Sequence, residues 1–293
     1  MDKFVSDQAA GLRRLLGQTG FQVITVMSGQ KNAGKTAATA NLAVALARSG
    51  RDVLIVDQDR HGRGAAAAFG LTPRYDVADA LAGRCDLDAL ILTGPDNVQV
   101  LPLGGGFKQL GSLSERDQDW LAQNFNRLQC GVDVVLVDME EATDPDALPL
   151  GLAASEIMVV LPPGNSAITE AYTLVKRLAQ NFGKCQFRLL LNRMSSAAQA
   201  EAVARNFSRT AEQYLGVSVD YLGYIPLDER LDRANRLRTS VVDAFPVAQS
   251  TSHFRTLADG LLRWPQPASL GGLGGFMQRV IQGGRLAEAC RRG

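Results

Sequence analysis

Short runs of apolar residues recur through the middle of the chain. Each run is rich in valine, isoleucine and leucine at successive positions, as the buried strands of parallel sheets are. The runs are QVITVM from Gln22, DVLIVD from Asp52, VQVLPL from Val98, DVVLVD from Asp133, IMVVLP from Ile157, FRLLLN from Phe187 and YLGYIP from Tyr221. The pattern predicts a buried strand at each of these places.

Segments with the spacing of amphipathic helices separate most of these runs. Two clear examples are TAATANLAVALARSG, which closes on Gly50, and AITEAYTLVKRLAQNFG, which closes on Gly183. Glycine is a common residue at the C-terminal end of a helix. Strands that are apolar on both faces and alternate with helices predict an α/β fold, with a mostly parallel central sheet flanked by helices on both faces.

Both ends of the chain fall outside this alternating body. Residues 1–20 carry a short helical pattern that places Val5, Ala9, Leu12 and Leu16 on one face. Residues 265–275 read PQPASLGGLGG, which is the composition of a linker. We therefore expect four parts: an N-terminal helix with its linker at 1–20, a main domain at 21–264, a linker at 265–275 and a short amphipathic segment at 276–293.

The last segment has two interpretations. Its apolar residues fall on one side of a helical wheel, opposite Gln278, Arg279 and Gln282; they are Phe276, Met277, Val280 and Ile281. Four apolar side chains give only marginal membrane affinity, although two copies in a dimer would bind better. The pattern fits a membrane-targeting helix, and the alternative is a helix that packs over a groove of the protein itself.

Composition excludes several classes of protein. The 293 residues include 31 Lys and Arg against 30 Asp and Glu, which is ordinary globular composition and excludes a disordered or strongly polybasic chain. Four scattered cysteines and two histidines make a zinc site or a disulfide framework unexpected. No apolar run reaches the roughly 18 residues of a membrane span, and MDKFVSDQ lacks the features of a signal peptide. We therefore expect a cytosolic protein.

A phosphate-binding motif lies between the first predicted strand and the helix after it. The eight residues read GQKNAGKT, which satisfies G-x-x-x-x-G-K-[ST]. In such a loop backbone N–H groups surround the phosphates, the lysine reaches the β and γ oxygens, and the hydroxyl ligates Mg²⁺. The expected nucleotide-binding residues here are Gly29, Gln30, Lys31, Asn32, Ala33, Gly34, Lys35, Thr36 and Ala37.

Aspartates stand at the ends of two predicted strands. Asp57 and Asp59 follow the second strand as DQD, and Asp138 ends the strand DVVLVD. Because parallel strands place their carboxyl ends at one edge of a sheet, these side chains are expected to converge on the phosphate loop. A carboxylate there can hold Mg²⁺ or orient the attacking water. For each aspartate taken alone the alternative is a turn or cap residue, whereas together with the phosphate loop they favour a nucleotide site.

The order of these motifs resembles the MinD/ParA group of P-loop ATPases, and within it the FlhG/FleN family of flagellar number regulators. The segments that carry the resemblance are SDQAAGLRRLL, SAITEAYTLVKRL, YIPLDERLDRANR, SVVDAFP and LLRWPQP, in the family's order. They extend over almost the whole chain. The resemblance implies a regulator of flagellar number and placement that binds ATP and Mg²⁺, and that is cytoplasmic and peripheral to the inner face of the cell membrane as an ATP-dependent homodimer.

The resemblance also assigns roles to single residues. Lys35 and Asp59 would be catalytic, with Asp59 orienting the hydrolytic water. Mg²⁺ would be held by Thr36, Asp57 and Asp138. Adenine would be recognised by Asn192 and flanked by Pro226 and Asp228. Taken alone, Asn192 would fit a cap after a strand equally well.

The N-terminal peptide implies a protein partner. Its DQAxxLR pattern is carried by Asp7, Gln8, Leu12 and Arg13, with Ala9 between them. In the family this peptide inserts into the GTPase FlhF as a helix and stimulates GTP hydrolysis, so Gln8 would be the activating residue. Flagellar C-ring proteins and a flagellar transcription activator are the further partners that the resemblance implies.

Several positions depart from the family pattern. Gln30 replaces the signature lysine that crosses the dimer, and Lys31 and Asn32 replace two glycines. After Asp138 come Glu140 and Glu141, where the family has small residues. These changes touch hydrolysis and dimer formation more than nucleotide binding. We therefore expect ATP binding and leave ATP hydrolysis open.

Two functions remain open at this point. One is a nucleotide-dependent dimer and membrane switch that stimulates FlhF, and the other is a hydrolysis-deficient adaptor on the same fold that acts by protein interaction only. A DNA-partition ATPase is disfavoured because the formal net charge of +1 offers little surplus for phosphate contacts, so no specific nucleic acid is expected.

Overall fold

The computed structural model describes residues 22–59, 61–104, 113–128, 131–139, 152–264 and 272–292. Several predicted features lie outside these ranges. They are the N-terminal peptide with Asp7, Gln8, Leu12 and Arg13, and the two glutamates Glu140 and Glu141. No helix in the described ranges is long and apolar enough to cross a membrane.

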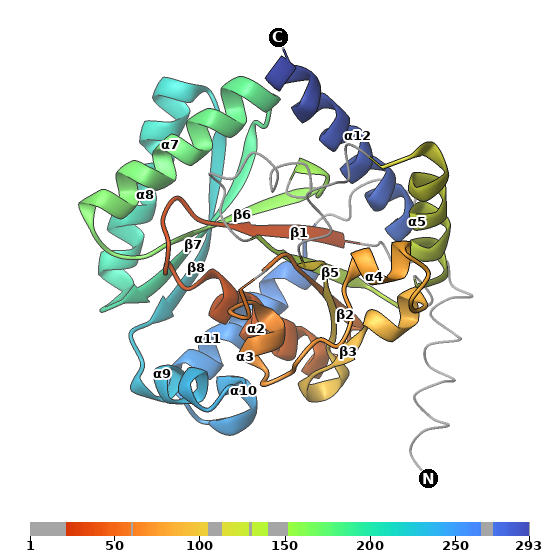
Figure 1. Cartoon of the computed structure of the whole chain (residues 1–293). Coiled ribbons are helices and arrows are strands. Elements are labelled where there is room, and N and C mark those ends of the chain that lie inside the picture. Colours follow the sequence, from red (N-terminus) through yellow and green to blue (C-terminus); the bar gives the residue numbers. More distant parts are fainter. Residues whose placement is uncertain are drawn as a thin grey trace.

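The described residues form one eight-stranded sheet in the order β3-β4-β2-β5-β1-β6-β7-β8 (Figure 1). The strands are β1 Gln22–Met27, β2 Val53–Asp57, β3 Leu92–Thr93, β4 Gln99–Pro102, β5 Val134–Asp138, β6 Glu156–Leu161, β7 Gln186–Met194 and β8 Ser218–Pro226. All neighbouring pairs are parallel except β3 with β4. The predicted mostly parallel sheet is confirmed. The edge strand β3 has only two residues and was not predicted.

Helices cover both faces of the sheet, as the apolar pattern predicts. They are α2 Lys35–Arg48, α3 Ala65–Ala68, α4 Val77–Leu81, α5 Glu115–Leu128, α7 Asn165–Phe182, α8 Ala197–Leu215, α9 Glu229–Arg236, α10 Val241–Ala244, α11 Gln249–Leu262 and α12 Gly272–Arg292, with short 3-10 turns η1 Leu87–Leu90 and η2 Pro95–Asn97. The helices α4, α5, α7, α8 and α12 pack on one face of the sheet, and α2, α3, α9, α10 and α11 pack on the other. Gly183 ends α7 in the left-handed conformation that its position predicts.

The strands supply both cores because their side chains alternate between the two faces. In β2, Leu54 and Val56 belong to the core beneath α4 and α5, whereas Val53 and Ile55 belong to the core beneath α2. Strand β1 lies between β5 and β6, so the chain builds the sheet outward in both directions from it. In such sheets ligands bind outside the carboxyl ends of the strands where the order reverses. The loop after β1 lies at that place.

Helix α12 is docked on the body of the protein, beside α5 (Figure 1). Its apolar face is removed from water, since Phe276, Met277 and Val280 are 0% exposed and Ile281 is 5% exposed. The helix begins at Gly272, inside the range expected to be a linker. The structure therefore has the docked arrangement, the second of the two that the sequence leaves open for this segment.

Candidate nucleotide site

The loop from Ser28 to Gly34 joins β1 to α2 at the carboxyl edge of the sheet. Asn32 has a φ of 59° and Gly34 a φ of 89°, both in the left-handed region, and Lys31 stays outside that region. Asparagine tolerates this conformation better than most residues, which explains how the loop manages without a glycine at position 32. No described side chain caps α2, so its first N–H groups suit a phosphate ligand.

Close contacts account for the two glycines of the motif. A Cβ atom on Gly29 would lie 2.3 Å from the backbone carbonyl carbon of Glu170 in α7. One on Gly34 would lie 2.1 Å from Nδ2 of Asn192. Because neither position has room for a side chain, both glycines are steric requirements of this loop.

Asn192 connects the phosphate loop to the end of β7. Its side chain is buried, and its Nδ2 donates a hydrogen bond of 2.8 Å to the carbonyl oxygen of Ala33. Its Oδ1 accepts a hydrogen bond of 2.9 Å from the backbone N–H of Arg193. A primary amide has two N–H groups and two acceptor lone pairs, so both ends of the carboxamide keep capacity for an adenine base.

The acidic part of the site consists of a buried carboxyl pair. Asp57 and Asp138 are register partners on β2 and β5, and both are buried. Oδ1 of Asp57 accepts from the N–H of Asp59 at 3.0 Å, and Oδ2 accepts from the N–H of Ala66 at 2.9 Å. Burial raises the pKa of Asp57 to about 6, although these two hydrogen bonds act in the opposite direction.

Asp138 is the more strongly perturbed of the two. Burial raises its pKa to about 7, and repulsion from Asp57 adds to the rise, while Lys35 and the hydroxyl of Thr36 oppose it. Its Oδ1 is buried and has no hydrogen-bond partner among the described residues. An orphaned carboxylate oxygen beside a threonine hydroxyl is the oxygen donor set that Mg²⁺ prefers, so the residues present fit this ion.

Asp59 lies just past β2 and is half-buried. Its Oδ2 accepts hydrogen bonds from the backbone N–H of Arg63 at 2.6 Å and of His61 at 3.0 Å. The carboxylate therefore holds the backbone of the residues that follow it, at the edge of the site. The water-orienting role that the family resemblance implies would fall to the other oxygen.

Pro226, one of the two residues predicted to flank the base, lies opposite the end of β7, two residues beyond Asn192. Pro226 is the register partner of Met194, and the N–H of Leu227 donates to the carbonyl oxygen of Met194 at 3.0 Å. Asp228 caps α9, and its two carboxylate oxygens accept hydrogen bonds from Arg230 and Ser250. The bonds to Ser250 were not visible in the sequence, because Ser250 is distant along the chain.

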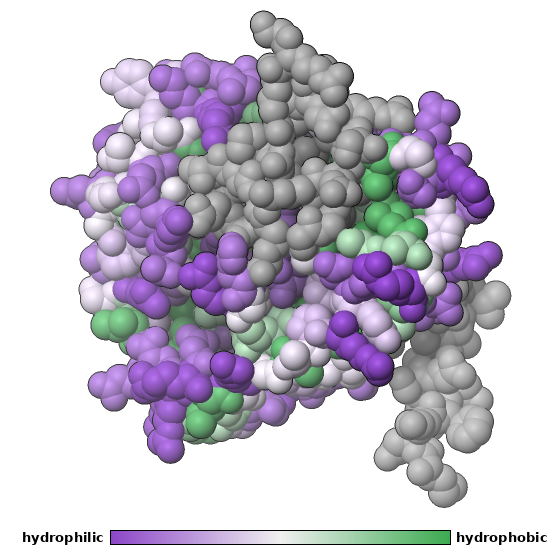
Figure 2. Space-filling view, in the orientation of Figure 1, coloured by the Kyte–Doolittle hydropathy of each residue, from purple (hydrophilic) through white to green (hydrophobic). Residues whose placement is uncertain are grey.

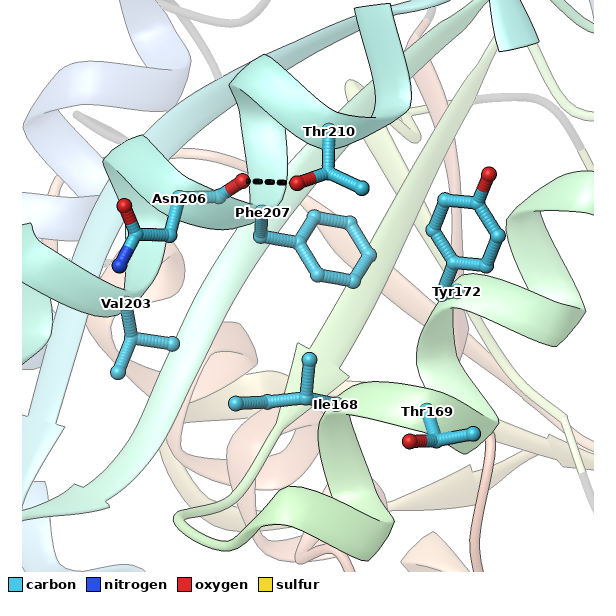
Figure 3. A pocket seen from close by; sticks show the side chains of 7 residues that line it. All are labelled: Ile168, Thr169, Tyr172, Val203, Asn206, Phe207 and Thr210. Atoms are coloured by element: carbon cyan, nitrogen blue, oxygen red, sulfur yellow. Dashed lines mark hydrogen bonds between the residues drawn. The ribbon is translucent and has the colours of Figure 1, made fainter. Parts of the chain in front are cut away.

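A separate hollow of about 300 Å³ lies between α7 and α8, and none of its lining residues belongs to the phosphate loop (Figure 3). Side chains of Ile168 and Tyr172 project into it from α7, and that of Phe207 from α8. Its lining is apolar or neutral, so it lacks the charged groups that phosphate binding needs. The predicted membrane residues Phe276, Met277, Val280 and Ile281 lie on this same face of the sheet, in the core with α5.

Sequence reasoning missed a group of buried polar residues that support the site. Asn41 lies in α2 and accepts hydrogen bonds from Ser240 and Val241, which stand at the start of α10. The available signal was an asparagine inside an otherwise apolar helical segment. Its partner could not be read from the sequence.

Comparison with known proteins places the chain in a family. The model of the CobQ/CobB/MinD/ParA nucleotide binding domain matches residues 24–239. The Antiactivator FleN of Pseudomonas aeruginosa is 32% identical over 262 residues, which cover 89% of this chain and 94% of that protein. The septum site-determining protein MinD of Synechocystis is 28% identical over 216 residues, covering 72% of this chain and 77% of that one.

Solved structures agree on the fold. The septum site-determining protein MinD complexed with Mg-ADP from Pyrococcus horikoshii covers 83% of this chain and 96% of its own, with a TM-score of 0.65 and 24% identity. The MinD cell division protein of Aquifex aeolicus covers 84% of this chain and 98% of its own, with a TM-score of 0.63 and 22% identity. The chain therefore belongs to the CobQ/CobB/MinD/ParA family of nucleotide-binding proteins, and within it to the FlhG/FleN type.

Proposed function

We propose that this chain is an Mg-ATP-binding regulator of flagellar number and placement. The observation that carries the proposal is the arrangement of Thr36, Asp57 and Asp138 beside the GQKNAGKT loop at the carboxyl ends of adjacent strands. Identity to an antiactivator named FleN supports the flagellar role. The flagellar role comes from similarity to this relative, whereas nucleotide binding comes from the residues of the site. The first test therefore measures the response to nucleotide.

We further propose that ATP and Mg²⁺ control a homodimer. The family's signature lysine is replaced by Gln30, and the neighbouring Lys31 is exposed on the same loop. Lys31 is the cation closest in sequence to the lost one, so we assign it the contact with the partner's nucleotide. Lys35 holds the phosphates in its own protomer, and Asp59 orients the hydrolytic water.

The first experiment is the molar mass in solution by light scattering, measured without nucleotide, with Mg-ADP and with Mg-ATP. A dimer that forms only with Mg-ATP, and that both Lys35→Ala and Lys31→Ala abolish, supports the switch. Arg255→Ala is the matched control, because it removes an exposed cation from α11, away from the loop. A molar mass that is the same with and without nucleotide contradicts the proposal that nucleotide controls dimer formation.

We propose that α12 attaches the protein to the inner face of the cell membrane from the cytoplasm. The apolar face that would enter the bilayer is the face now packed beside α5, so docking and membrane binding exclude one another. Membrane attachment therefore requires that the helix leave the body. Co-sedimentation with anionic vesicles, with and without Mg-ATP, measures this. Vesicle binding that a deletion of residues 272–293 leaves unchanged would contradict the proposal.

The partner proposed for residues 1–20 is the GTPase FlhF, with Gln8 as the activating residue and Asp7, Leu12 and Arg13 as docking residues. Flagellar C-ring proteins and a flagellar transcription activator are proposed as further partners. FlhF GTPase activity is measured with this chain and with Gln8→Ala, which should remove the stimulation. Gln18→Ala is the matched control, since it lies outside the DQAxxLR pattern.

A second candidate function rests on the same loop. Gln30 in place of the signature lysine favours a hydrolysis-deficient adaptor that acts by protein interaction only. The two functions differ in their response to Lys35→Ala. If this variant stimulates FlhF and localises as the unchanged protein does, the adaptor is favoured; if localisation is lost, the switch is favoured.

A further inference from the structure

A buried network of hydrogen bonds begins on the helix that carries the phosphate loop. Asn41 in α2 is 1% exposed, and its Nδ2 donates to the carbonyl oxygen of Ala37 at 2.7 Å. Its Oδ1 accepts from the hydroxyl of Ser240 at 2.8 Å and from the N–H of Val241 at 2.7 Å. The same side chain therefore fixes α2, which starts at Lys35, to the first residues of α10.

The network ends on the loop of Leu227 and Asp228 between β8 and α9, which is proposed to flank the base and is called the base loop here. Oδ2 of Asp228 accepts from the N–H of Ser250 at 3.0 Å and from its hydroxyl at 2.7 Å. The next residue, Thr251, places its hydroxyl 3.1 Å from the carbonyl oxygen of Val241 and 2.8 Å from that of Phe245. The first turn of α11 thus holds both the base loop and α10.

The two ends of the proposed nucleotide site are consequently joined through one segment, whose buried contacts are made by Ser240 and Thr251. Both of these residues are at most 1% exposed, so water cannot replace a lost partner without entering the core. A buried donor that loses its acceptor carries the full cost of desolvation. The separation between the phosphate loop and the base loop is therefore set in part by the buried hydrogen bonds of Asn41 and Thr251.

We infer that Asn41 is a positioning residue for nucleotide selection, which rests on the proposed binding of ATP. A ligand made only of phosphates contacts the loop and the start of α2. A nucleotide must also reach Asn192 and the base loop. Its affinity therefore depends on the distance between the phosphate loop and the base loop, which Asn41 helps to maintain. The direct hydrogen bond from Asn192 to Ala33 is a second link between the two ends, so loss of Asn41 weakens the selection without abolishing it.

The test compares the dissociation constants of Mg-ATP and of magnesium tripolyphosphate for each variant by titration calorimetry. Asn41→Leu keeps the approximate size of the side chain and removes the acceptor for two buried donors. We expect the affinity for Mg-ATP to fall about tenfold and that for tripolyphosphate to change less than about twofold. Ser240→Ala, which leaves the Val241 bond in place, should lose ATP affinity in the same direction by a smaller factor.

Thr39→Val is the matched control for the core of α2. Its hydroxyl is buried and donates to the carbonyl oxygen of Lys35 within the same helix, at 3.0 Å, so its removal breaks no link between elements. The ratio of the two affinities should stay at the value of the unchanged protein. If Asn41→Leu fails to fold, Ser240→Ala and Thr251→Val decide the question.

Two results would overturn the inference. Equal losses for both ligands would make Asn41 a structural residue of the phosphate loop, and unchanged ATP affinity in every network variant would show that the spacing does not matter. An unchanged protein that binds neither ligand overturns the proposed function itself, before any variant is compared. The failure of the inference is thus distinguishable from the failure of the proposed function.

Discussion

At the scale of single residues, the carboxyl pair of Asp57 and Asp138 differs from most acids of a folded protein. Both groups are buried side by side at the ends of β2 and β5, and burial raises the pKa of each. In the unfolded chain both return to ordinary values near 3.8. The folded protein therefore binds more protons than the unfolded chain between pH 3.8 and about 7.

This difference predicts how stability depends on pH without metal or nucleotide. Because the unfolded chain binds fewer protons at these groups, their contribution to the free energy of unfolding decreases as pH rises, by up to about 1.4 kcal/mol per unit for each group. Asp138→Asn should remove the contribution of Asp138 to this decrease. From pH 5 to pH 7.5 the free energy of unfolding should therefore fall less in the variant than in the unchanged protein. Urea unfolding at both values measures this. An identical pH dependence in the two proteins would contradict the raised pKa.

A second prediction concerns the first glycine of the phosphate motif. Gly29→Ala places a methyl group against the backbone of Glu170, which should cost about 1–3 kcal/mol of stability and displace the loop from α7. Gly260→Ala is the control, since a Cβ there meets nothing within 4 Å, and alanine favours the helix α11. Thermal unfolding should separate the two variants. Equal melting temperatures would mean that α7 moves away at little cost.

The sequence predicted much of the site at this scale. Thr36, Asp57 and Asp138 lie close together, as expected from strand ends and a phosphate motif that define one edge of a parallel sheet. Their roles in binding stay a prediction. The hydrogen bonds of Asp228 to Ser250 were not predictable, since they depend on how α11 returns to β8. Local patterns locate a residue along an element, but they do not reveal which distant element it contacts.

At the scale of elements, α12 is also a case in which the sequence locates an element but not its contacts. Its amphipathic pattern was visible in the sequence, yet a pattern does not say which surface it covers. In the structure the apolar face packs with α5, and Nε of Arg279 donates to the carbonyl oxygen of Ala153 at 3.0 Å. Nζ of Lys184 donates to the adjacent Leu152 at 2.8 Å. Burial lowers the pKa of both cations, and in Lys184 the nearby Arg279 contributes to the decrease.

Docking of this helix should contribute to the stability of the fold. Phe276→Ala removes a fully buried ring, so we expect the free energy of unfolding to fall by about 3–5 kcal/mol. Gln282→Ala is the control on the same helix, because this side chain is exposed and should change stability by less than about 0.5 kcal/mol. Urea unfolding measures both. A Phe276→Ala protein as stable as the control would mean that the helix spends most of its time undocked.

At the scale of the whole molecule, the apolar side chains of the described residues are gathered mainly in the interior. On the side drawn in Figure 2 the described residues are mostly hydrophilic, with small separate apolar areas. The fully buried faces instead lie in two cores on opposite sides of the sheet, one beneath α5, α7, α8 and α12 and the other beneath α2 and α9–α11. The order of apolar runs and helices was sufficient to predict these layers, because the central strands β1, β2, β5 and β6 are apolar on both of their faces.

The two cores have a consequence for how variants combine. Phe276 belongs to one core and Asn41 faces the elements of the other, with the strands between them. Substitutions without shared neighbours usually add within about 0.5 kcal/mol, so Phe276→Ala with Asn41→Leu should destabilise by the sum of the single effects. A bound nucleotide can change that sum only if the strands between the two cores transmit its effect from one core to the other. If the two substitutions are additive without Mg-ATP but not with it, the sheet that separates the two cores also connects them energetically when nucleotide is bound.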